Sequence, residues 1–310
     1  MELSVVTTLY QSAPFLEEFH RRISSEAARL TKHYEIVLVN DGSPDHSLDV
    51  ALGLHEGDPH VKIVDLSRNF GHHKAIMTGL AHARGERLFL IDCDLEEPPE
   101  LLGTFQRELT RTRADVVYGI QEKRKGALFE RLSGELFFKA FNALSPHRLP
   151  PNVTTVRLMT RRYVDSLLLH QEREMVVAGL WVITGFEQVA LPVQKGSRGG
   201  SSYDLARKGI VLIDAVTSFS DRPLIFIFYL GLLIVLLASL AAAYFVVRRL
   251  FFGVLLAGWP SLIISIWLLG GLTLFCLGLI GIYLSKVFVE TKQRPYTIVR
   301  AVYEHSREPA

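Results

Sequence analysis

The sequence is poor in cysteine and carries almost no net charge, and each shortage excludes a class of protein. Its two cysteines, Cys93 and Cys276, lie in very different stretches and lack metal-ligand spacing. They predict neither a disulfide framework nor a structural zinc site, and they fit a reducing compartment. The formal net charge of +2 over 310 residues gives no reason to expect a nucleic acid partner.

The chain also lacks the pattern of a secretory signal at its start. It opens on the strand-like Leu3-Ser4-Val5-Val6, with no basic segment and no short apolar core of the signal-peptide kind. We therefore expect the residues from 1 to about 220 to lie in the cytoplasm.

Charge is missing from two long stretches near the C-terminus. The hydrophobic content of 49% is high, and the excess lies after residue 222. Residues 224–247 are uncharged, and as a helix they extend about 36 Å, enough to cross a bilayer core. A second uncharged run, 253–285, predicts a span at 261–284. Together they predict a transmembrane hairpin within 223–285; two buried helices of a soluble core are the alternative.

The segments on either side of the hairpin complete the predicted membrane topology. Apolar residues recur at helical spacing over 205–219, which favours an amphipathic membrane-surface helix in a juxtamembrane segment 205–222. A surface helix of the globular part is the alternative. We expect the tail, 286–310, to return to the cytoplasm, although Arg248 and Arg249 at the far end of the first span weaken the positive-inside pattern.

The remainder, residues 1–204, alternates short apolar runs with amphipathic helical patterns. Such alternation predicts an α/β domain with a mostly parallel, Rossmann-like sheet and helices on both faces. The predicted strands are 3–9, 34–39, 61–66, 88–91, 114–119 and 153–159, with a short helix and a strand between 175 and 191.

An acidic stretch follows the fourth predicted strand. Asp92, Asp94, Glu96 and Glu97 come directly after the apolar run 88–91. Open α/β sheets bind ligands at the carboxyl ends of their strands, and carboxylates there suit Mg²⁺ or Mn²⁺ arriving with phosphate. A solvated acidic turn is the alternative.

Two further strand ends are expected at the same edge of the sheet. Tyr10 follows the first strand, and Asp41 follows the second within Asn40-Asp41-Gly42-Ser43. Asp41 could accept a hydrogen bond from a nucleobase N–H, and Tyr10 could pack near the ring. Each element alone is ordinary turn chemistry, but their combination favours a nucleotide site.

Three blocks of this sequence resemble the motifs of inverting family 2 glycosyltransferases of GT-A fold. They are Asn-Asp-Gly-Ser-Pro-Asp at 40–45, Ser-Arg-Asn-Phe-Gly-His-His at 67–73, and Asp-Cys-Asp-Leu-Glu-Glu-Pro-Pro at 92–99. More narrowly, the chain is similar to the polyprenyl-phosphate branch, which includes dolichol-phosphate mannose synthases and undecaprenyl-phosphate sugar transferases. The likeness extends through Val-Arg-Leu-Met at 156–159, the hairpin and Lys-Gln-Arg-Pro at 292–295.

The resemblance implies a metal-dependent enzyme of the cytoplasmic membrane whose catalytic domain faces the cytoplasm. It would transfer a sugar from a nucleotide-sugar donor to a polyprenyl phosphate, with Mg²⁺ or Mn²⁺ as cofactor. Homo-oligomerisation stays open. A processive polysaccharide synthase would need more spans and a Gln-x-x-Arg-Trp block, which the sequence lacks. A transferase to a different lipid acceptor and a catalytically degenerate nucleotide-binding subunit are also compatible with the sequence.

The resemblance also implies a set of site residues, grouped by role. The catalytic residues are Asp92, Asp94 and Arg131. The nucleotide-binding residues are Thr8, Tyr10, Asp41, Ser67, Asn69, Lys74, Asp92 and Cys93. The acceptor phosphate falls to Arg124, Arg131 and Ser133, the sugar to Thr155 and Arg157, and the metal to Asp94 and Glu96.

Several positions depart from the family pattern. Thr8 replaces a proline, Gln11-Ser12 an Asn-Glu pair, Glu96 a glutamine, and Thr155 an aspartate that lies near the sugar or acceptor in relatives. The last change leaves the identity of the donor sugar open. His72 and His73 are interpreted as structural or surface residues. For Arg124 and Arg131, a solvated basic surface or a headgroup patch is the alternative.

Overall fold

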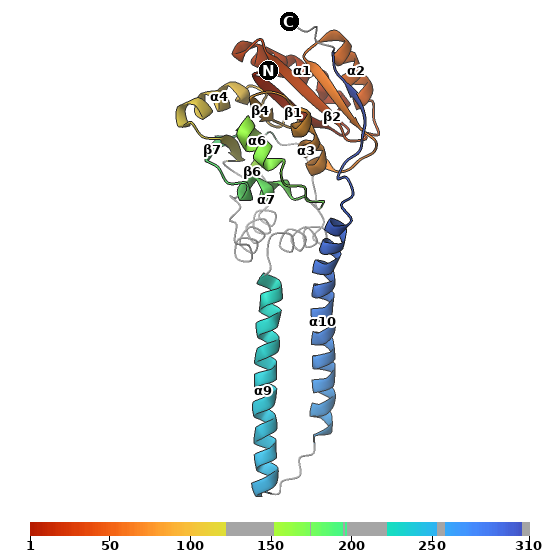
Figure 1. The fold of residues 1–310 in the computed structure, drawn as a ribbon, viewed down its shortest axis with the longest axis vertical. Helices are drawn as coiled ribbons and strands as arrows, with labels where there is room; N and C mark the ends of the chain where they lie inside the picture. Colours follow the sequence, from red (N-terminus) through yellow and green to blue (C-terminus); the bar gives the residue numbers. More distant parts are fainter. Residues whose placement is uncertain (122–151, 174, 195, 197–221, 253–257, 306–310) are drawn as a thin grey trace.

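A computed structural model shows an α/β domain from which two long helices project side by side (Figure 1). It describes residues 1–121, 152–173, 175–194, 196, 222–252 and 258–305. The predicted amphipathic segment 205–219 and the residues Arg124, Arg131 and Ser133 lie outside this described part.

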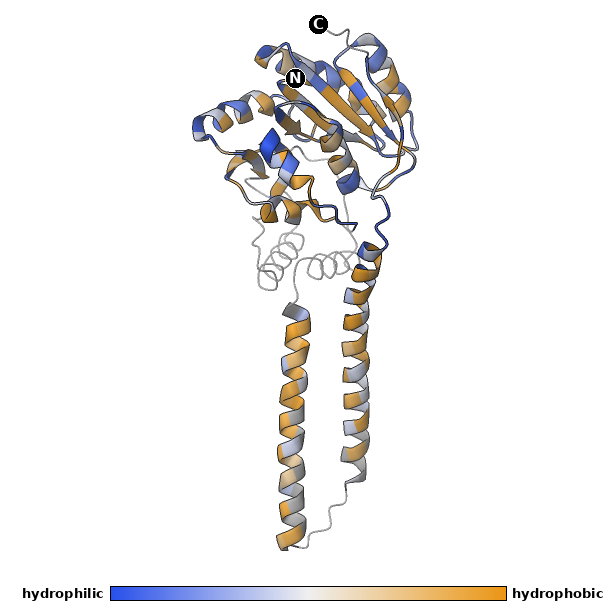
Figure 2. Cartoon of the chain, in the orientation of Figure 1, coloured by the Kyte–Doolittle hydropathy of each residue, from blue (hydrophilic) through white to orange (hydrophobic). Residues whose placement is uncertain are grey.

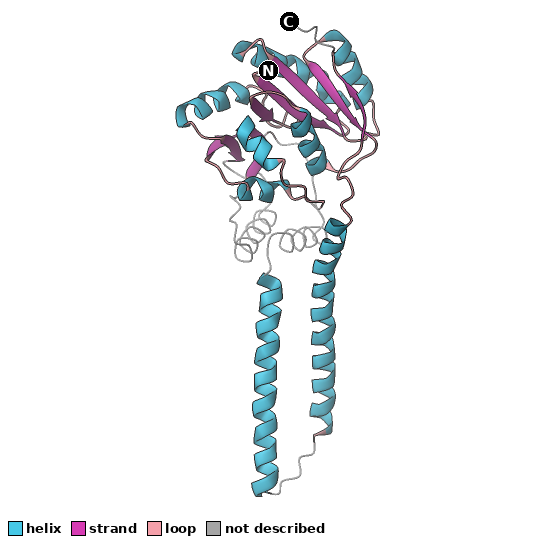
Figure 3. Cartoon of the chain, viewed as in Figure 1, coloured by secondary structure: helices cyan, strands magenta, loops and turns pink. Residues whose placement is uncertain are grey.

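The strands form one 8-stranded sheet in the order β7-β5-β6-β4-β1-β2-β3-β8. β1 pairs in parallel with β2 and β4, and only β6 and β8 run against their neighbours in this sheet. The predicted mostly parallel α/β fold is therefore confirmed. Figure 3 shows the strands of the sheet with helices packed around them. The strands are β1 Leu3–Leu9, β2 Tyr34–Asn40, β3 Val61–Leu66, β4 Arg87–Leu90, β5 Val116–Gln121, β6 Val153–Thr160, β7 Gln188–Val193 and β8 Val299–Tyr303.

Helices cover both faces of the sheet because its central strands are apolar on both sides. Successive side chains of a strand point to opposite faces, so Val5 joins one hydrophobic cluster and Val6 the other. The periodic residues Leu16, Phe19 and Ile23 of one helix are fully buried against the first cluster. The first face carries α1 Ala13–Leu30, α2 Ser47–Gly57 and α4 Leu101–Thr112; the second carries α3 His72–His82, α6 Arg161–Leu167 and α7 Val177–Ile183.

Among the residues that the structure describes, two helices are long and apolar enough to cross a membrane: α9 Arg222–Phe252 and α10 Trp259–Thr291. The candidate spans within them, Pro223–Ala241 and Ser265–Thr291, are not buried against the rest of the protein. Figure 2 shows that apolar residues predominate along most of the length of both helices. The exposure of the spans argues against buried core helices, because apolar surface of this extent needs a nonpolar environment.

The segment after α10 returns to the sheet, which the sequence pattern does not predict. β8 pairs antiparallel with β3 at the sheet edge. Arg300 lies 3.5 Å from the buried Asp65 carboxylate and donates a 2.8 Å hydrogen bond to the Ser67 carbonyl. Thr297 and Thr78 of α3 share a 2.8 Å hydroxyl–hydroxyl hydrogen bond. The segment that follows α10 is thus bonded directly to β3 and to α3.

The contact of α3 with the sheet gives a stability prediction. A Cβ on Gly79 would lie 2.6 Å from Val6 Cγ1 and 2.7 Å from Val39 Cγ2. Overpacking of this kind costs about 1–3 kcal/mol, which equals or exceeds the roughly 1 kcal/mol that alanine gains over glycine in a helix. We expect Gly79→Ala to lower the thermal unfolding midpoint of the detergent-solubilised protein.

Gly53 in α2 is the matched control, because no atom lies within 4 Å of its added Cβ. Gly53→Ala should raise the same midpoint, since only the helix propensity changes. Equal shifts for the two variants would contradict the tight packing of α3 on β1 and β2.

Candidate functional site

The carboxyl ends of β2, β1 and β4 lie side by side at one edge of the sheet, because the three strands run parallel. The register pairs Leu9 at the end of β1 with Asn40 at the end of β2. It pairs Val6 with Leu90, two residues before Asp92. The predicted convergence of Asp41 and Asp92 on one edge follows from this pairing.

Asp41 is almost fully buried and holds the loop that follows β3. Its Oδ1 accepts a 2.7 Å hydrogen bond from the Phe70 backbone N–H, and its Oδ2 a 3.0 Å bond from that of Gly71. Burial raises the pKa of the Asp41 carboxyl, and the two backbone donors lower it in part. Each carboxylate oxygen has a second lone pair that could accept another donor.

Gly42 lets the turn after β2 approach this same loop. Its φ of +57° lies in the left-handed region, and an added Cβ would meet the Arg68 carbonyl carbon and the Asn69 nitrogen at 2.4 Å. Only glycine fits both the backbone angle and the close approach. The Asp41-Gly42 pair therefore positions the second motif block against the first.

His72, at the start of α3, links two strand ends. Its Nδ1 lies 3.0 Å from Thr8 Oγ1 near the end of β1, and its Nε2 lies 3.6 Å from Asp92 Oδ1 after β4. The His72 side chain is 46% exposed and the Asp92 side chain 23% exposed, so both lie at the surface of the site. His73 instead lies 3.0 Å from the Met175 carbonyl oxygen, a contact that fits a structural residue.

The acidic loop after β4 is a compact turn. Asp94 Oδ1 accepts a 3.0 Å hydrogen bond from the Glu96 backbone N–H, and Leu95 between them has a φ of +62°. The Gly196 N–H donates a 2.8 Å bond to the Glu96 carbonyl oxygen. Gly196, which follows β7, is thus hydrogen-bonded to the acidic loop.

These carboxylates fit a divalent metal that arrives with phosphate. Within the described ranges no three His, Cys, Asp or Glu side chains group closely enough to hold a metal alone. Mg²⁺ commonly takes only one or two protein carboxylates when substrate phosphates and water complete its octahedron. The predicted metal residues Asp94 and Glu96, with Asp92 beside them, suit that arrangement and do not suit an all-protein cage.

The other residues expected at the nucleotide differ in their exposure. Tyr10 is 49% exposed, and Asn69 is exposed on the loop after β3. Lys74 is half-buried in the first turn of α3. The backbone N–H of Ser67 donates a 2.9 Å hydrogen bond to the Ile298 carbonyl and so belongs to the contact with the C-terminal segment. Cys93 lies beneath the edge, where burial raises the pKa of its thiol to about 11.

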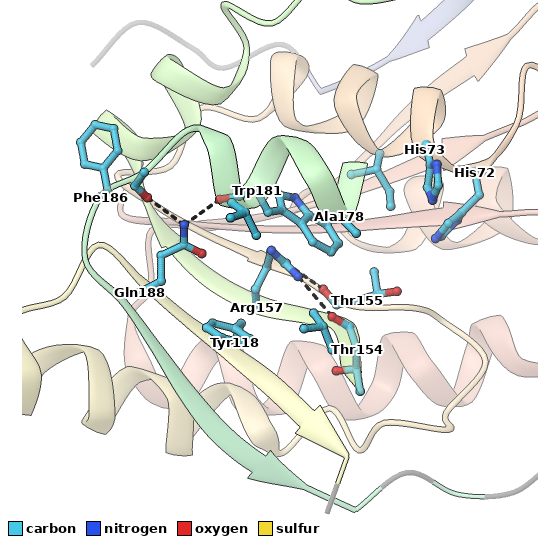
Figure 4. Close-up of a pocket in the computed structure, with 14 residues that line it drawn as sticks. His72, His73, Tyr118, Thr154, Thr155, Arg157, Ala178, Trp181, Phe186 and Gln188 are labelled. Atoms are coloured by element: carbon cyan, nitrogen blue, oxygen red, sulfur yellow. Dashed lines mark hydrogen bonds between the residues drawn. The ribbon is translucent and has the colours of Figure 1, made fainter. Parts of the chain in front are cut away.

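A pocket of about 450 Å³ adjoins this edge, between β6, β5 and α7. Arg157 lies at its centre, with Trp181 on one side and Tyr118 on the other (Figure 4). The guanidinium donates 3.2 Å hydrogen bonds to the Thr154 and Thr155 carbonyl oxygens. Its carbon lies 2.9 Å from the centroid of the Trp181 ring. Burial lowers the pKa of Arg157 to about 9, which leaves the group charged at neutral pH.

Several residues of this pocket, and the contact of His72 with Asp92, were not predicted from the sequence. Trp181, Phe186 and Gln188 line the pocket from α7 and the segment after it. Gln188 Nε2 donates a 2.6 Å hydrogen bond to the Trp181 carbonyl oxygen, which joins β7 to that helix. No local motif marks these residues. Only His72 lies within one of the three motif blocks.

Comparison with known proteins identifies the family of this chain. Residues 4–168 match the family model described as glycosyl transferase family 2. A Mycobacterium tuberculosis (strain CDC 1551 / Oshkosh) protein that carries a glycosyltransferase name is 52% identical over 100% of this chain and 92% of its own. The bactoprenol glucosyl transferase of Shigella phage SfV is 30% identical over 97% of this chain and 98% of its own.

A solved structure supports the fold. The mannosyl-3-phosphoglycerate synthase of Rubrobacter xylanophilus superposes with a TM-score of 0.50 and 18% identity, over 70% of this chain and 73% of that chain. With the parallel sheet, this likeness confirms the predicted GT-A-like domain, and the two apolar helices are consistent with the predicted hairpin. The strand ends, the family match and the full-length relatives lead to one conclusion: the chain belongs to glycosyl transferase family 2.

Proposed function

We propose that this protein transfers a sugar from a nucleotide-sugar donor to a polyprenyl phosphate, with inversion, at the cytoplasmic face of the cytoplasmic membrane. The observation that carries this proposal is that Asp41, Thr8 and Asp92 lie at one edge of the sheet. The same sheet includes β8, the strand that follows the apolar helix α10. Family membership and the bactoprenol glucosyl transferase relative support it.

The order of the strands suggests how the donor lies across this edge. Tyr10 and Asp41, after β1 and β2, contact the nucleoside in our proposal, together with Asn69 and Lys74. The diphosphate then reaches Asp92 and Asp94 after β4, which is the next strand beyond β1. Neighbouring strands lie about 4.8 Å apart. The two steps from β2 across β1 to β4 therefore give a separation close to that between the nucleoside and the diphosphate of the donor.

The proposed transfer needs positioning more than a base. An oxygen of the acceptor phosphate attacks the anomeric carbon from the face opposite the leaving group, the bond to the diphosphate oxygen breaks, and the nucleoside diphosphate leaves with the electron pair. A phosphate is already ionised at neutral pH, so Thr155 in place of a carboxylate is compatible with this acceptor. A divalent metal held by Asp94 and Glu96, with Asp92 facing the diphosphate, would offset the charge that develops on the diphosphate.

The membrane part supports a lipid acceptor. α10 ends beside the α/β domain, where Glu290 Oε1 accepts a 2.6 Å hydrogen bond from the Arg173 backbone N–H. Arg173 Nε donates a 2.7 Å bond to the Arg294 carbonyl oxygen. We propose that this junction keeps the donor site at the membrane surface, where Arg124, Arg131 and Ser133 receive the lipid phosphate.

The direct test is incubation of the purified protein with nucleotide sugars, undecaprenyl phosphate and Mg²⁺ or Mn²⁺, followed by mass analysis of the lipid. We expect a lipid-linked monosaccharide, with nucleoside diphosphate formed only when the lipid is present. Release of nucleoside diphosphate at the same rate without lipid would contradict the proposal.

Asp94→Asn tests the metal and diphosphate assignment. We expect the transfer rate to fall by about 100-fold or more, because one charged group facing the diphosphate and its metal is lost. The unfolding midpoint should stay near that of the unmodified protein. Asp49→Asn, at an exposed position of α2, is the matched control and should retain full activity. Undiminished metal-dependent transfer by Asp94→Asn would remove the assignment.

Arg131→Ala tests the acceptor assignment. We expect the KM for undecaprenyl phosphate to rise by about 10- to 100-fold, as for loss of a hydrogen bond to a charged group. The KM for the nucleotide sugar should change little. Arg131→Lys should recover only part of the loss, because lysine lacks the bidentate fork. Arg111→Ala, on the exposed surface of α4, serves as the control, and an unchanged lipid KM in Arg131→Ala would argue against the role.

A further inference from the structure

The pocket around Arg157 holds a buried cation for which the described residues provide no anion. Arg157 is only 1% exposed. No Asp or Glu of the described ranges forms an ion pair with it. The acidic groups beside it are the hydroxyls of Tyr163 and Tyr118, and burial raises the pKa of each, so both are uncharged at neutral pH. Position 155, two residues earlier on β6, is a threonine, so this strand supplies no carboxylate either.

The Arg157 guanidinium has N–H donors beyond those that bond to backbone carbonyls, and these can bond to a ligand. It has five N–H groups, and Nε and Nη2 donate to two backbone carbonyls. Trp181, whose ring stacks on it, has a buried indole N–H that bonds to no described residue. A buried charge without a counter-charge is costly, and a ligand that brings an anion into the pocket would offset that cost.

The position of the pocket matches the sugar end of the donor. β6 is the neighbour of β4 on the side away from β1, and Arg157 pairs with Leu90, two residues before Asp92. A donor with its nucleoside at β2 and β1 and its diphosphate at β4 therefore extends its sugar toward β6. His72, which contacts Asp92, also lines the pocket and joins the two regions.

We propose that this pocket binds a donor sugar that carries a carboxylate, so that the substrate is a nucleoside diphosphate hexuronate read by Arg157. This inference rests on the proposed transferase function and names its substrate class. A planar carboxylate matches the guanidinium fork and balances its single charge.

A phosphate group fits the pocket less well than a carboxylate does. It carries up to two negative charges, and Arg157 is the only Lys or Arg among the residues that line the pocket in the described part of the chain. Its remaining walls include the aromatic rings of Tyr118, Trp181 and Phe186. Such rings suit the C–H faces of a pyranose better than a highly charged ion.

The test compares matched donors that differ only at C6. They are UDP-glucuronate against UDP-glucose, UDP-galacturonate against UDP-galactose, and GDP-mannuronate against GDP-mannose, each with undecaprenyl phosphate and Mg²⁺ or Mn²⁺. We expect kcat/KM for one uronate to exceed that of its neutral partner by about 10- to 100-fold, the gain of a bidentate charged pair. Equal or better transfer of the neutral partner in every pair would overturn the inference and leave the transferase proposal standing. Transfer from none of the six would also overturn the inference, whereas the transferase proposal is decided by the wider set of nucleotide sugars.

Variants at Arg157 separate a sugar contact from a purely structural role. Arg157→Lys keeps the charge and should retain part of the preference for the uronate, whereas Arg157→Gln should abolish it. The ratio of the two donors is measured within one preparation, so partial unfolding cancels. Arg111→Gln is the control and should keep the unmodified ratio. A higher KM for undecaprenyl phosphate in Arg157→Gln with an unchanged donor ratio would assign Arg157 to the acceptor and overturn the inference.

Discussion

The parallel pairing of β1 with β2 on one side and β4 on the other is the constraint on which the site depends. Hydrogen bonds along these ladders align the carboxyl ends of the strands, so residues separated by more than eighty positions meet at one edge. Burial of both faces of β1 leaves little freedom of register, because a slip of one residue would exchange Val5 and Val6 between the two clusters. The packing that fixes the core therefore also fixes the positions of the site residues at the ends of these strands.

Buried polar groups next to this edge hold the neighbouring loops in place by hydrogen bonds. The Asp41 carboxylate holds two backbone N–H groups of the loop before α3, and that loop presents His72 to Thr8 and Asp92. The buried Asp65 performs a similar task on the next strand, where it accepts from Asn40 and attracts Arg300. Through β8 the same network reaches the end of α10, so the site and the apolar hairpin share one set of contacts.

In the pocket beside the acidic loop, the positive charge of Arg157 is buried although no described residue supplies an anion to pair with it. Arg157 is held by two carbonyls and by the face of Trp181, which fixes its direction without neutralising it. A group arranged in this way is preorganised for an anion, since little reorganisation is needed when a ligand enters. Carboxylates at Asp92 and Asp94 and a cation at Arg157 make neighbouring regions of opposite charge along one strand edge.

The amino-acid sequence by itself determined the alternation of strands and helices, the three acidic or polar strand ends, the two apolar helices and the family. These are local features: a period of two or of 3.6 residues, a proline or glycine at a turn, or an uncharged run. Only the tertiary structure decided that the half-buried Val299–Tyr303 becomes a strand, because its hydrogen bonds require the open edge of β3. It also decided that His72 meets Asp92 and that Trp181 covers Arg157, since those pairs come from elements far apart in the chain whose contact depends on how the helices pack on the sheet.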